Sequence, residues 1–342
     1  MGENMKPGLH FRSPEVSVLM SCYNAGRWLH EAIDSVLVQT FENFEFILVD
    51  DGSTDETWNI IQSYRARDER IVAISKKNTG LPDSLNVGIA KARGAWIARL
   101  DADDLCEPTR LEEQASFVHK HPEVVLLGTG CVEIDEQGRV KKKHIYPSGH
   151  RRLVRHLVRL QRFFPHSSAF YRADVVKQVG GYNIRFSNTD DLWLWLELLS
   201  RGKIACLPKS LVRIRTHSGQ ISNENSGRRQ VRDGRAVIAC HFLRKAGCGD
   251  PSVDASANEW IGFVNWVEKK VEESGTFERR KAWIEARVEY FGGESKLTGA
   301  LRFGIGLLQS GHASLLVWEK LFGSSMPKRL AREWMKRSCA GS

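Results

Sequence analysis

The chain has 342 residues, enough for about two domains, and a net charge of +9 with 42% hydrophobic residues, a composition that excludes an intrinsically disordered protein. No apolar run approaches the ~20 residues of a membrane span, and the polar N-terminus lacks the apolar core of a secretion signal. Seven scattered cysteines without a CxxC pair argue against a disulfide framework and a zinc site, so we expect a cytoplasmic protein.

Up to about residue 130, short apolar segments alternate with amphipathic ones. The pattern predicts strands at residues 16–20, 44–50, 71–75, 95–101 and 124–130, and helices at residues 27–38, 55–66, 81–92 and 110–121. Apolar strands separated by helices form a mainly parallel sheet that is covered on both faces. The predicted fold class is therefore α/β, and ligands of such sheets bind beyond the carboxyl ends of the strands.

Aspartates follow two of these strands. Asp50 and Asp51 stand where "FEFILVD" runs into "DDGS", and "RLDADDL" places Asp101, Asp103 and Asp104 after the fourth strand. Carboxylates at one sheet edge repel each other, and Mn²⁺ or Mg²⁺ with a phosphorylated ligand would neutralise them. Alternatively, these are ordinary turn and helix-capping aspartates. No glycine-rich phosphate loop is present, so a nucleotide would be held by carboxylates, metal and loop backbone.

A basic stretch follows the predicted sheet. Residues 137–173 contain ten Lys or Arg and no Asp or Glu, and Arg152, Arg155, Arg159 and Arg162 share one face of a predicted helix. Two explanations fit this spacing equally: a basic face exposed to solvent, or a surface that contacts an anionic membrane or a lipid diphosphate. The membrane hypothesis involves the basic segments 139–162 and 320–337. The chain has no aromatic–basic module of a nucleic-acid binder, and we expect no nucleic-acid partner.

After about residue 226 the pattern changes to consecutive helices, predicted at residues 228–246, 258–273, 278–291 and 297–309. We therefore expect two domains. Residues 1–225 would form the α/β domain with the acidic sheet edge that could hold a nucleotide, and residues 226–342 would form a helical region that contacts a membrane surface or another subunit.

Several motifs occur together in a fixed order. They are the segment from "VSVLMSCYNAG" to "DDGSTDET", then "NTGLPDSLNVGIAKARGAWIARLDADD", "HSSAFYR", "VGGY" and "DDLWLWLEL". In this order and spacing they resemble the family 2 glycosyltransferases of GT-A fold, over roughly residues 14–225. The likeness is to bacterial, non-processive enzymes of polysaccharide or lipopolysaccharide synthesis, because the QxxRW motif and membrane spans of the processive synthases are absent.

The resemblance implies a hexosyltransferase that uses a UDP-sugar. Asp51 would accept a hydrogen bond from the uracil ring, and Ser21, Tyr23 and Asn24 would line the nucleotide pocket. Asp101 would lie near the ribose and sugar, and Asp103 would bind the divalent cation that bridges the diphosphate. The implied reaction moves one sugar, with inversion, to a hydroxyl of a glycan or lipid-linked acceptor. From the cysteines we expect a cytoplasmic protein, which would be peripheral to the inner face of the membrane if its basic segments contact lipid.

The catalytic base is where the sequence departs from the family pattern. An ungapped alignment puts Asn188 and Thr189 at the usual Glu-Asp pair, whereas deletion of one residue puts Asp190 at the base position and Asp191 at the helix start. We expect Asp190 to be the base and to stay ionised at the helix N-terminus. Alternatively, Asp190 and Asp191 only cap the helix, and the protein binds a nucleotide sugar without turnover.

Four further side chains are candidates. By the same resemblance, His217 in "RTHSGQIS" would lie close to the metal or diphosphate, and His166 near the acceptor and donor sugar; a lone histidine is more often structural. Of Trp193 and Trp195, we expect one in the core and the other lining a sugar platform.

Overall fold

The structure is a computed structural model that describes residues 13–220, 227–273 and 329–334. The chain divides into two compact units. One consists of Met1–Leu157 with Arg162–Gln220, and the other of Val158–Gln161 with Ile221–Ser342. The domain boundary between residues 225 and 226 stays a prediction.

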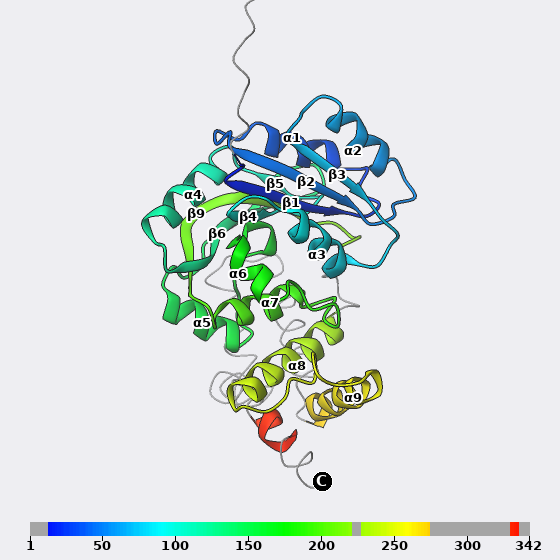
Figure 1. Cartoon of the computed structure of the whole chain (residues 1–342), viewed down its shortest axis with the longest axis vertical. Coiled ribbons are helices and arrows are strands. Elements are labelled where there is room, and N and C mark those ends of the chain that lie inside the picture. Colours follow the sequence, from blue (N-terminus) through cyan, green and yellow to red (C-terminus); the bar gives the residue numbers. More distant parts are fainter. Residues whose placement is uncertain (1–12, 221–226, 274–328, 335–342) are drawn as a thin grey trace, which may run out of the picture. The chain divides into compact units, whose positions relative to one another are not determined.

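The first unit is built on one mixed sheet (Figure 1). Its strands are β1 (Val16–Cys22), β2 (Phe44–Asp50), β3 (Ile71–Ser75), β4 (Trp96–Arg99), β5 (Leu105–Cys106), β6 (Val124–Ile134), β7 (Val140–His144), β8 (Phe170–Arg172) and β9 (Lys203–Arg215). They lie in the order β3-β2-β1-β4-β8-β6-β9-β5, and β7 pairs with β6. The predicted α/β sheet is confirmed, and β5, β7 and β8 are antiparallel additions that the sequence pattern did not predict.

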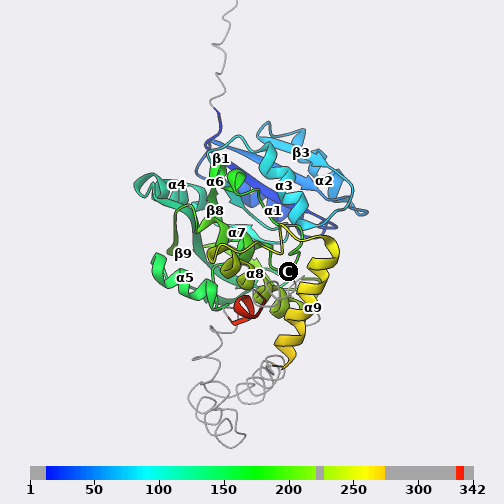
Figure 2. The same cartoon turned by 60° about the horizontal axis from the view of Figure 1, so that its bottom comes forward.

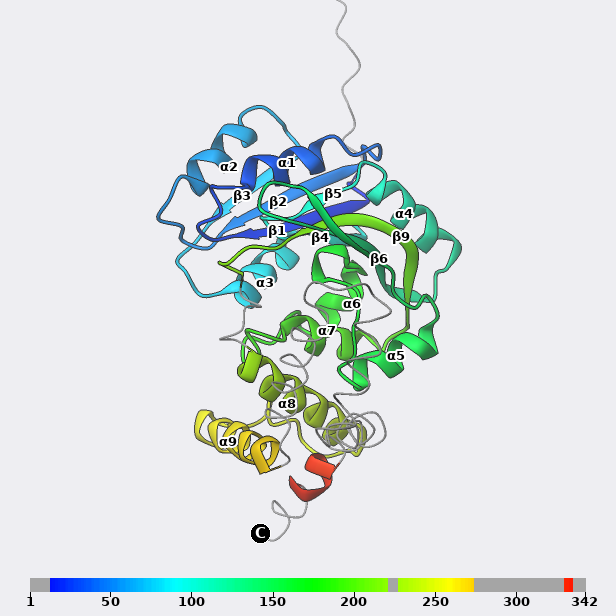
Figure 3. The same ribbon diagram turned by 180° about the vertical axis from the view of Figure 1, so that it is seen from behind.

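Helices cover both faces of this sheet. They are α1 (Leu29–Leu37), α2 (Thr57–Arg65), α3 (Leu81–Lys91), α4 (Arg110–Lys120), α5 (His150–Val158), α6 (Ala173–Gln178) and α7 (Asp190–Leu198). Figures 1 and 3 show α1 and α2 on one face of β1–β3 and α3 on the other. Every residue of β2 is buried, as expected for a strand between two helical layers.

The strand directions decide where the ends of the strands meet. β1, β2, β3 and β4 are parallel to one another. β8 is antiparallel to both β4 and β6, so β6 and its parallel neighbour β9 run in the direction of β4. The carboxyl ends of β1, β2, β4 and β9, and the start of β8, therefore lie at one edge of the sheet.

The prediction of one helix face with four arginines is wrong for Arg159 and Arg162. α5 ends at Val158, and Leu160 has a φ of 52°, a left-handed conformation that an α-helix cannot continue through. Only Arg152 and Arg155 lie on the helix, while Leu153 and Leu157 are buried.

The second unit contains α8 (Gly227–Lys245) and α9 (Ala257–Glu273), which pack against each other (Figure 2). The ring of Trp334, in the helical residues 329–334, lies 5.0 Å from the ring of Phe263 and 5.2 Å from that of Trp266. The first two predicted helices agree with α8 and α9 to within one residue at each end, and the two at 278–291 and 297–309 lie outside the described residues. Among the helices of the described ranges, none has the length and apolarity to cross a membrane.

Candidate functional site

The loops that follow β1 and β2 are tied together. The backbone N–H of Asn24 donates to Ser53 Oγ at 3.0 Å, and Asn24 Oδ1 accepts from the backbone N–H of Thr54 at 2.9 Å. Asn24 has a φ of 48°, which asparagine tolerates better than most residues. Tyr23 beside it is 53% exposed, and Ser21 is part-buried on β1. The exposed ring and the polar atoms around it can receive a planar, polar group.

Asp51 is buried just beyond β2 and binds the loop before α3. Its Oδ1 accepts from the backbone N–H of Thr79 at 3.0 Å and pairs with Lys76, and its Oδ2 accepts from the backbone N–H of Gly80 at 2.9 Å. Burial raises the pKa of Asp51, but the hydrogen bonds from Lys76 and from the backbone of Thr79 and Gly80 lower it more, so that the pKa lies below its ordinary value. Asp51 is therefore a fixed carboxylate at neutral pH.

The segment after β4 carries a cluster of three carboxylates. One oxygen each of Asp101, Asp103 and Asp104 lies within 4.8 Å of the other two. Asp104 is buried, and its Oδ1 accepts from the backbone N–H of Arg215 at 2.8 Å. Burial, followed by the charges of Asp103 and Asp101, raises the pKa of Asp104 well above its ordinary value. Asp104 thus holds the turn against the end of β9.

Ser167, just before β8, lies between two of these acids. Its hydroxyl lies 2.9 Å from Asp101 Oδ2 and also contacts Asp104 Oδ2. A hydroxyl has one proton, so it can donate to only one carboxylate at a time. A protonated Asp104 would remove this conflict, in agreement with the direction of its pKa.

Asp103 and His217 form the part of the cluster that suits a cation. Asp103 Oδ2 lies 2.8 Å from His217 Nε2, and the carboxylate is part-exposed. Burial and Asp101 raise the pKa of Asp103, and His217 opposes the rise. Two hard oxygen donors, Asp101 and Asp103, with an imidazole beside them, make a donor set that fits Mn²⁺ or Mg²⁺. Asp104 is buried and already contacts Arg215 and Ser167, so Asp101 and Asp103 are the more accessible oxygen donors of the cluster.

Arg99 is a buried cation behind the cluster. It pairs with Asp101, and its Nη1 donates to Ser167 Oγ at 3.0 Å. Burial lowers the pKa of Arg99, but the charge of Asp101 raises it more, and Asp190 adds to the rise. Arg99 therefore stays charged within electrostatic range of Asp190.

Asp190 begins α7 and is buried, and its Oδ2 has no hydrogen-bond partner in the part of the chain that the structure describes. Burial and then Asp191 raise the pKa of Asp190 well above its ordinary value, against Arg99. Burial and the charge of Asp191 thus oppose the ionised form of Asp190, whereas Arg99 and the helix N-terminus favour it. Burial also raises the pKa of Asp191, whose Oδ1 accepts from the backbone N–H of Leu192 at 2.7 Å. Asp190 thus combines a raised pKa with a buried oxygen that has no partner among the described residues.

The remaining candidates lie behind this site. His166 Nε2 is 2.6 Å from the hydroxyl of Tyr182, which is 3.2 Å from that of Tyr171. Burial and Arg99 lower the pKa of His166 well below its ordinary value, so its ring is neutral. Trp193 and Trp195 are both buried, and Trp195 packs edge-on against His166 at 6.1 Å. The expectation that one of the two tryptophans forms an open sugar platform is therefore wrong.

The structure adds four residues that the sequence did not single out: Lys76, Arg99, Ser167 and Arg215. Arg99 stands in "RLDADD", and an arginine inside a strand that is otherwise apolar could have been noticed, because such a residue is rarely buried without a partner. Ser167 and Lys76 have no comparable signal in a single sequence.

Comparison with known sequences gives the family. The family model described as "Glycosyl transferase family 2" matches residues 17–180. The putative glycosyltransferase EpsE of Bacillus subtilis is 39% identical over 193 residues, which cover 55% of this chain and 68% of that protein. The amylovoran biosynthesis glycosyltransferase AmsE of Erwinia amylovora is 33% identical over 210 residues, which cover 60% of this chain and 78% of that protein.

Solved structures with the same fold include the following two. Residues 1–349 of TarS from S. aureus in complex with UDP-GlcNAc match with a TM-score of 0.57 and 19% identity, over 94% of this chain and 92% of that one. The mannosyltransferase PcManGT from Pyrobaculum calidifontis in complex with GDP-Man and Mn²⁺ matches with a TM-score of 0.52 and 15% identity, over 94% of this chain and 87% of that one.

The contacts of Asp51 lead to a stability prediction. Asp51→Asn should reduce the free energy of unfolding by about 1.5–3 kcal/mol at pH 7, because charged hydrogen bonds to two N–H groups and Lys76 are weakened. The native pKa of Asp51 is depressed, so its contribution is complete above the unfolded pKa of about 3.9 and is lost as pH falls through the native value. Urea unfolding at pH 7 measures the loss of stability, and urea unfolding in the acid range measures its dependence on pH.

Asp174→Asn is the control, because Asp174 pairs with Arg172 on the surface and is 53% exposed. It should cost less than about 1 kcal/mol. Equal losses for the two variants at pH 7 would contradict the role given to Asp51.

Proposed function

The chain belongs to glycosyltransferase family 2 and has the GT-A fold, and from this premise we propose that it transfers one sugar from a UDP-sugar to a hydroxyl of a glycan or lipid-linked acceptor. The observation that carries the proposal is the meeting of three kinds of carboxylate at one edge of the sheet. They are an ionised one (Asp51), a part-exposed one beside a histidine (Asp103) and a buried one with an unpaired oxygen (Asp190).

The donor site that we propose lies at the ends of β1 and β2. Asp51 would accept from the uracil ring, and Ser21, Tyr23 and Asn24 would line the pocket. Asp51 already accepts three protein donors, and the lone pairs of a carboxylate leave room for one more. The complex of TarS with UDP-GlcNAc, a protein of the same fold, supports a UDP-sugar.

Asp103 would hold a divalent cation, with Asp101 and His217 beside it. When bound, Mn²⁺ or Mg²⁺ would act as a Lewis acid on the diphosphate leaving group. Asp101 would also contact the ribose and sugar, and its ion pair with Arg99 holds it in place. The Mn²⁺ complex of PcManGT supports a metal ion in this fold.

Asp190 would remove the proton from the attacking hydroxyl. A raised pKa makes a carboxylate a stronger base once it is deprotonated, and Arg99 opposes protonation. One base and one leaving group on opposite sides of the anomeric carbon give a single displacement with inversion. Asp191 would position Asp190 at the first turn of α7.

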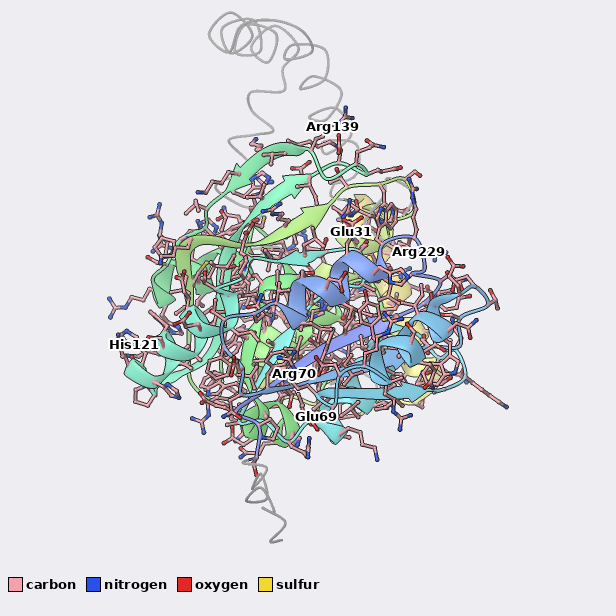
Figure 4. The ribbon with its side chains drawn as sticks, turned by 90° about the horizontal axis from the view of Figure 1, so that it is seen from above. Glu31, Glu69, Arg70, His121, Arg139 and Arg229 are labelled. Carbon is pink, nitrogen blue, oxygen red and sulfur yellow. The ribbon has the colours of Figure 1, made fainter. Side chains whose placement is uncertain are left out.

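We also propose that the protein is cytoplasmic and peripheral to the inner face of the membrane, with residues 1–225 as the catalytic domain and 226–342 as an accessory helical domain. Support comes from the edge strand β7, where Lys141, Lys142 and Lys143 are exposed beside the exposed Val140 and Ile145. Figure 4 shows Arg139 pointing outward at the preceding turn. Apolar side chains among lysines suit an anionic lipid surface. Most of segment 320–337 lies outside the described residues.

The metal site gives a direct prediction. Asp103→Asn should abolish the stabilisation by Mn²⁺ and the metal-dependent transfer, because a neutral amide replaces the charged ligand. Thermal unfolding with and without Mn²⁺, beside an assay of UDP release, measures both effects. The control is Asp34→Asn, which changes an exposed acid that accepts from the hydroxyl of Tyr64. Full Mn²⁺-dependent transfer by Asp103→Asn would refute the metal role.

The base is tested by its own isosteric change. Asp190→Asn should reduce the transfer rate by ~10²–10⁴ while UDP affinity persists, and Asp191→Asn should reduce it far less. In the wild type, kcat/KM should fall with decreasing pH through an apparent pKa of the Asp190–Asp191 pair that lies above the ordinary 3.9, because the proton blocks the base.

The outcomes of this pair separate three cases. If Asp191→Asn is inactive and Asp190→Asn is active, the base is Asp191. If neither variant loses activity, the base lies outside this segment. UDP binding by a wild-type protein that turns over no UDP-sugar would favour the non-catalytic alternative.

The membrane contact is tested by charge reversal. Lys142→Glu with Lys143→Glu should weaken sedimentation with phosphatidylglycerol vesicles at least tenfold, since each lysine near such a surface contributes about 1 kcal/mol. Lys91→Glu with Lys120→Glu changes the net charge equally at two exposed positions on α3 and α4 and should bind as the wild type does. Equal binding by both double variants would rule out a contact through β7.

A further inference from the structure

Arg215 is the last residue of β9, and its side chain is only 1% exposed. Its guanidinium donates to three separate segments of the chain. Nη2 donates to Glu31 Oε2 of α1 at 2.8 Å, Nε to the carbonyl of Asp103 at 3.1 Å, and Nη1 to the carbonyl of Glu136 at 3.1 Å. One buried cation therefore joins α1, the turn after β4 and the turn between β6 and β7.

The backbone of Arg215 contacts the same turn. Its N–H donates to Asp104 Oδ1 at 2.8 Å, so the Asp103–Asp104 turn is held by a side-chain and a main-chain donor of one residue. Asp103 has its carbonyl fixed in this way while its carboxylate stays part-exposed beside His217. The contacts restrain the backbone of Asp103 and leave its carboxylate open to a ligand.

The histidine is oriented by neighbours of Arg215. The ring of His217 lies 4.3 Å from the ring of Trp28, and Cζ of Arg215 lies 5.6 Å from the same ring. His217 Nδ1 accepts from the backbone N–H of Gly219 at 3.2 Å, so the proton of a neutral ring is on Nε2, which points at Asp103. Trp28 is the N-cap of α1, so the start of this helix contacts both Arg215, through Glu31, and His217, through Trp28.

We propose that Arg215 is a positioning residue for the divalent cation: it holds the Asp103 turn and the end of β9 together, so that Asp103 and His217 meet before the cation arrives. The inference rests on the proposed metal site. Arginine suits this task because its planar fork donates in several fixed directions, whereas lysine offers one compact ammonium group. Partners that orient metal ligands typically change metal affinity 10–100-fold when they are removed.

The test compares two arginines of one strand. Arg215→Lys should weaken Mn²⁺ binding 10–100-fold, measured by electron paramagnetic resonance of free Mn²⁺ in the presence of UDP. Arg213→Lys is the matched control, because Arg213 is two residues earlier on β9, is 43% exposed and pairs at 2.7 Å with Glu107, which is not one of the three clustered acids. It should bind Mn²⁺ as the wild type does.

Kinetics add a readout that a purely structural role would not change. For Arg215→Lys, the Mn²⁺ concentration that gives half-maximal transfer should rise, and saturating Mn²⁺ should restore most of kcat. UDP affinity in the presence of a chelator should be unchanged, because the donor contacts lie at β1 and β2. A variant whose kcat stays low at saturating Mn²⁺ while its Mn²⁺ affinity is normal would overturn the proposal.

A second variant covers a failure of Arg215→Lys to fold. Glu31→Gln keeps the shape of the partner on α1, which is 59% exposed and is labelled in Figure 4, and it should weaken Mn²⁺ binding several-fold. If wild type and Asp103→Asn bind Mn²⁺ equally, the proposed metal site itself fails. If the wild type binds through Asp103 and both Arg215→Lys and Glu31→Gln bind equally well, only the inference about Arg215 fails.

Discussion

Like charge at one edge of the sheet is the constraint on which the first unit depends. Parallel strands bring their carboxyl ends together, and here those ends supply Asp51, Asp101, Asp103 and Asp104. Such a set is stable only if cations or protons compensate it. A buried or part-buried cation lies behind two of the acids, since Lys76 pairs with Asp51 and Arg99 with Asp101, while Asp104 accepts a main-chain N–H and has a raised pKa.

The negative charges of these acids are not stabilised equally, and this difference distinguishes the roles that we propose for them. Asp51 has a lowered pKa, because a lysine and two backbone N–H groups stabilise its charge. Asp103 and Asp190 have raised pKa values, because burial and like charge dominate at both. A carboxylate whose ionised form is stabilised by the protein suits a hydrogen bond from a neutral N–H or O–H donor. A carboxylate whose ionised form is destabilised is stabilised most when it binds a cation or a proton. One sheet edge thus holds acids whose environments suit the three roles that we propose for them: recognition, metal binding and proton transfer.

The sequence predicted what depends on periodicity. Helices α3, α4, α8 and α9 lie within one residue of their predicted bounds, because their apolar spacing is regular over 11 to 19 residues. β5, with two residues, and β8, with three, are too short for any period, so the antiparallel strand inside the sheet (β8) and the one at its end (β5) were missed. The break of α5 at Leu160 was missed because the local pattern of Arg and Leu continues through it. The pairs Arg99–Asp101 and Arg215–Glu31 depend on tertiary contact, which spacing alone does not contain.

The missed strand β8 has a consequence for the chemistry. Because it runs against β4, the residues before it, not after it, come to the edge where the acids gather. Ser167 thereby contacts Asp101 and Asp104, and His166 contacts Tyr182 behind the site. A parallel strand in this place would have turned these side chains to the opposite edge and left Arg99 and Asp101 without their shared hydroxyl. Reversal of one three-residue strand therefore lets a segment 66 residues further along the chain complete the carboxylate cluster.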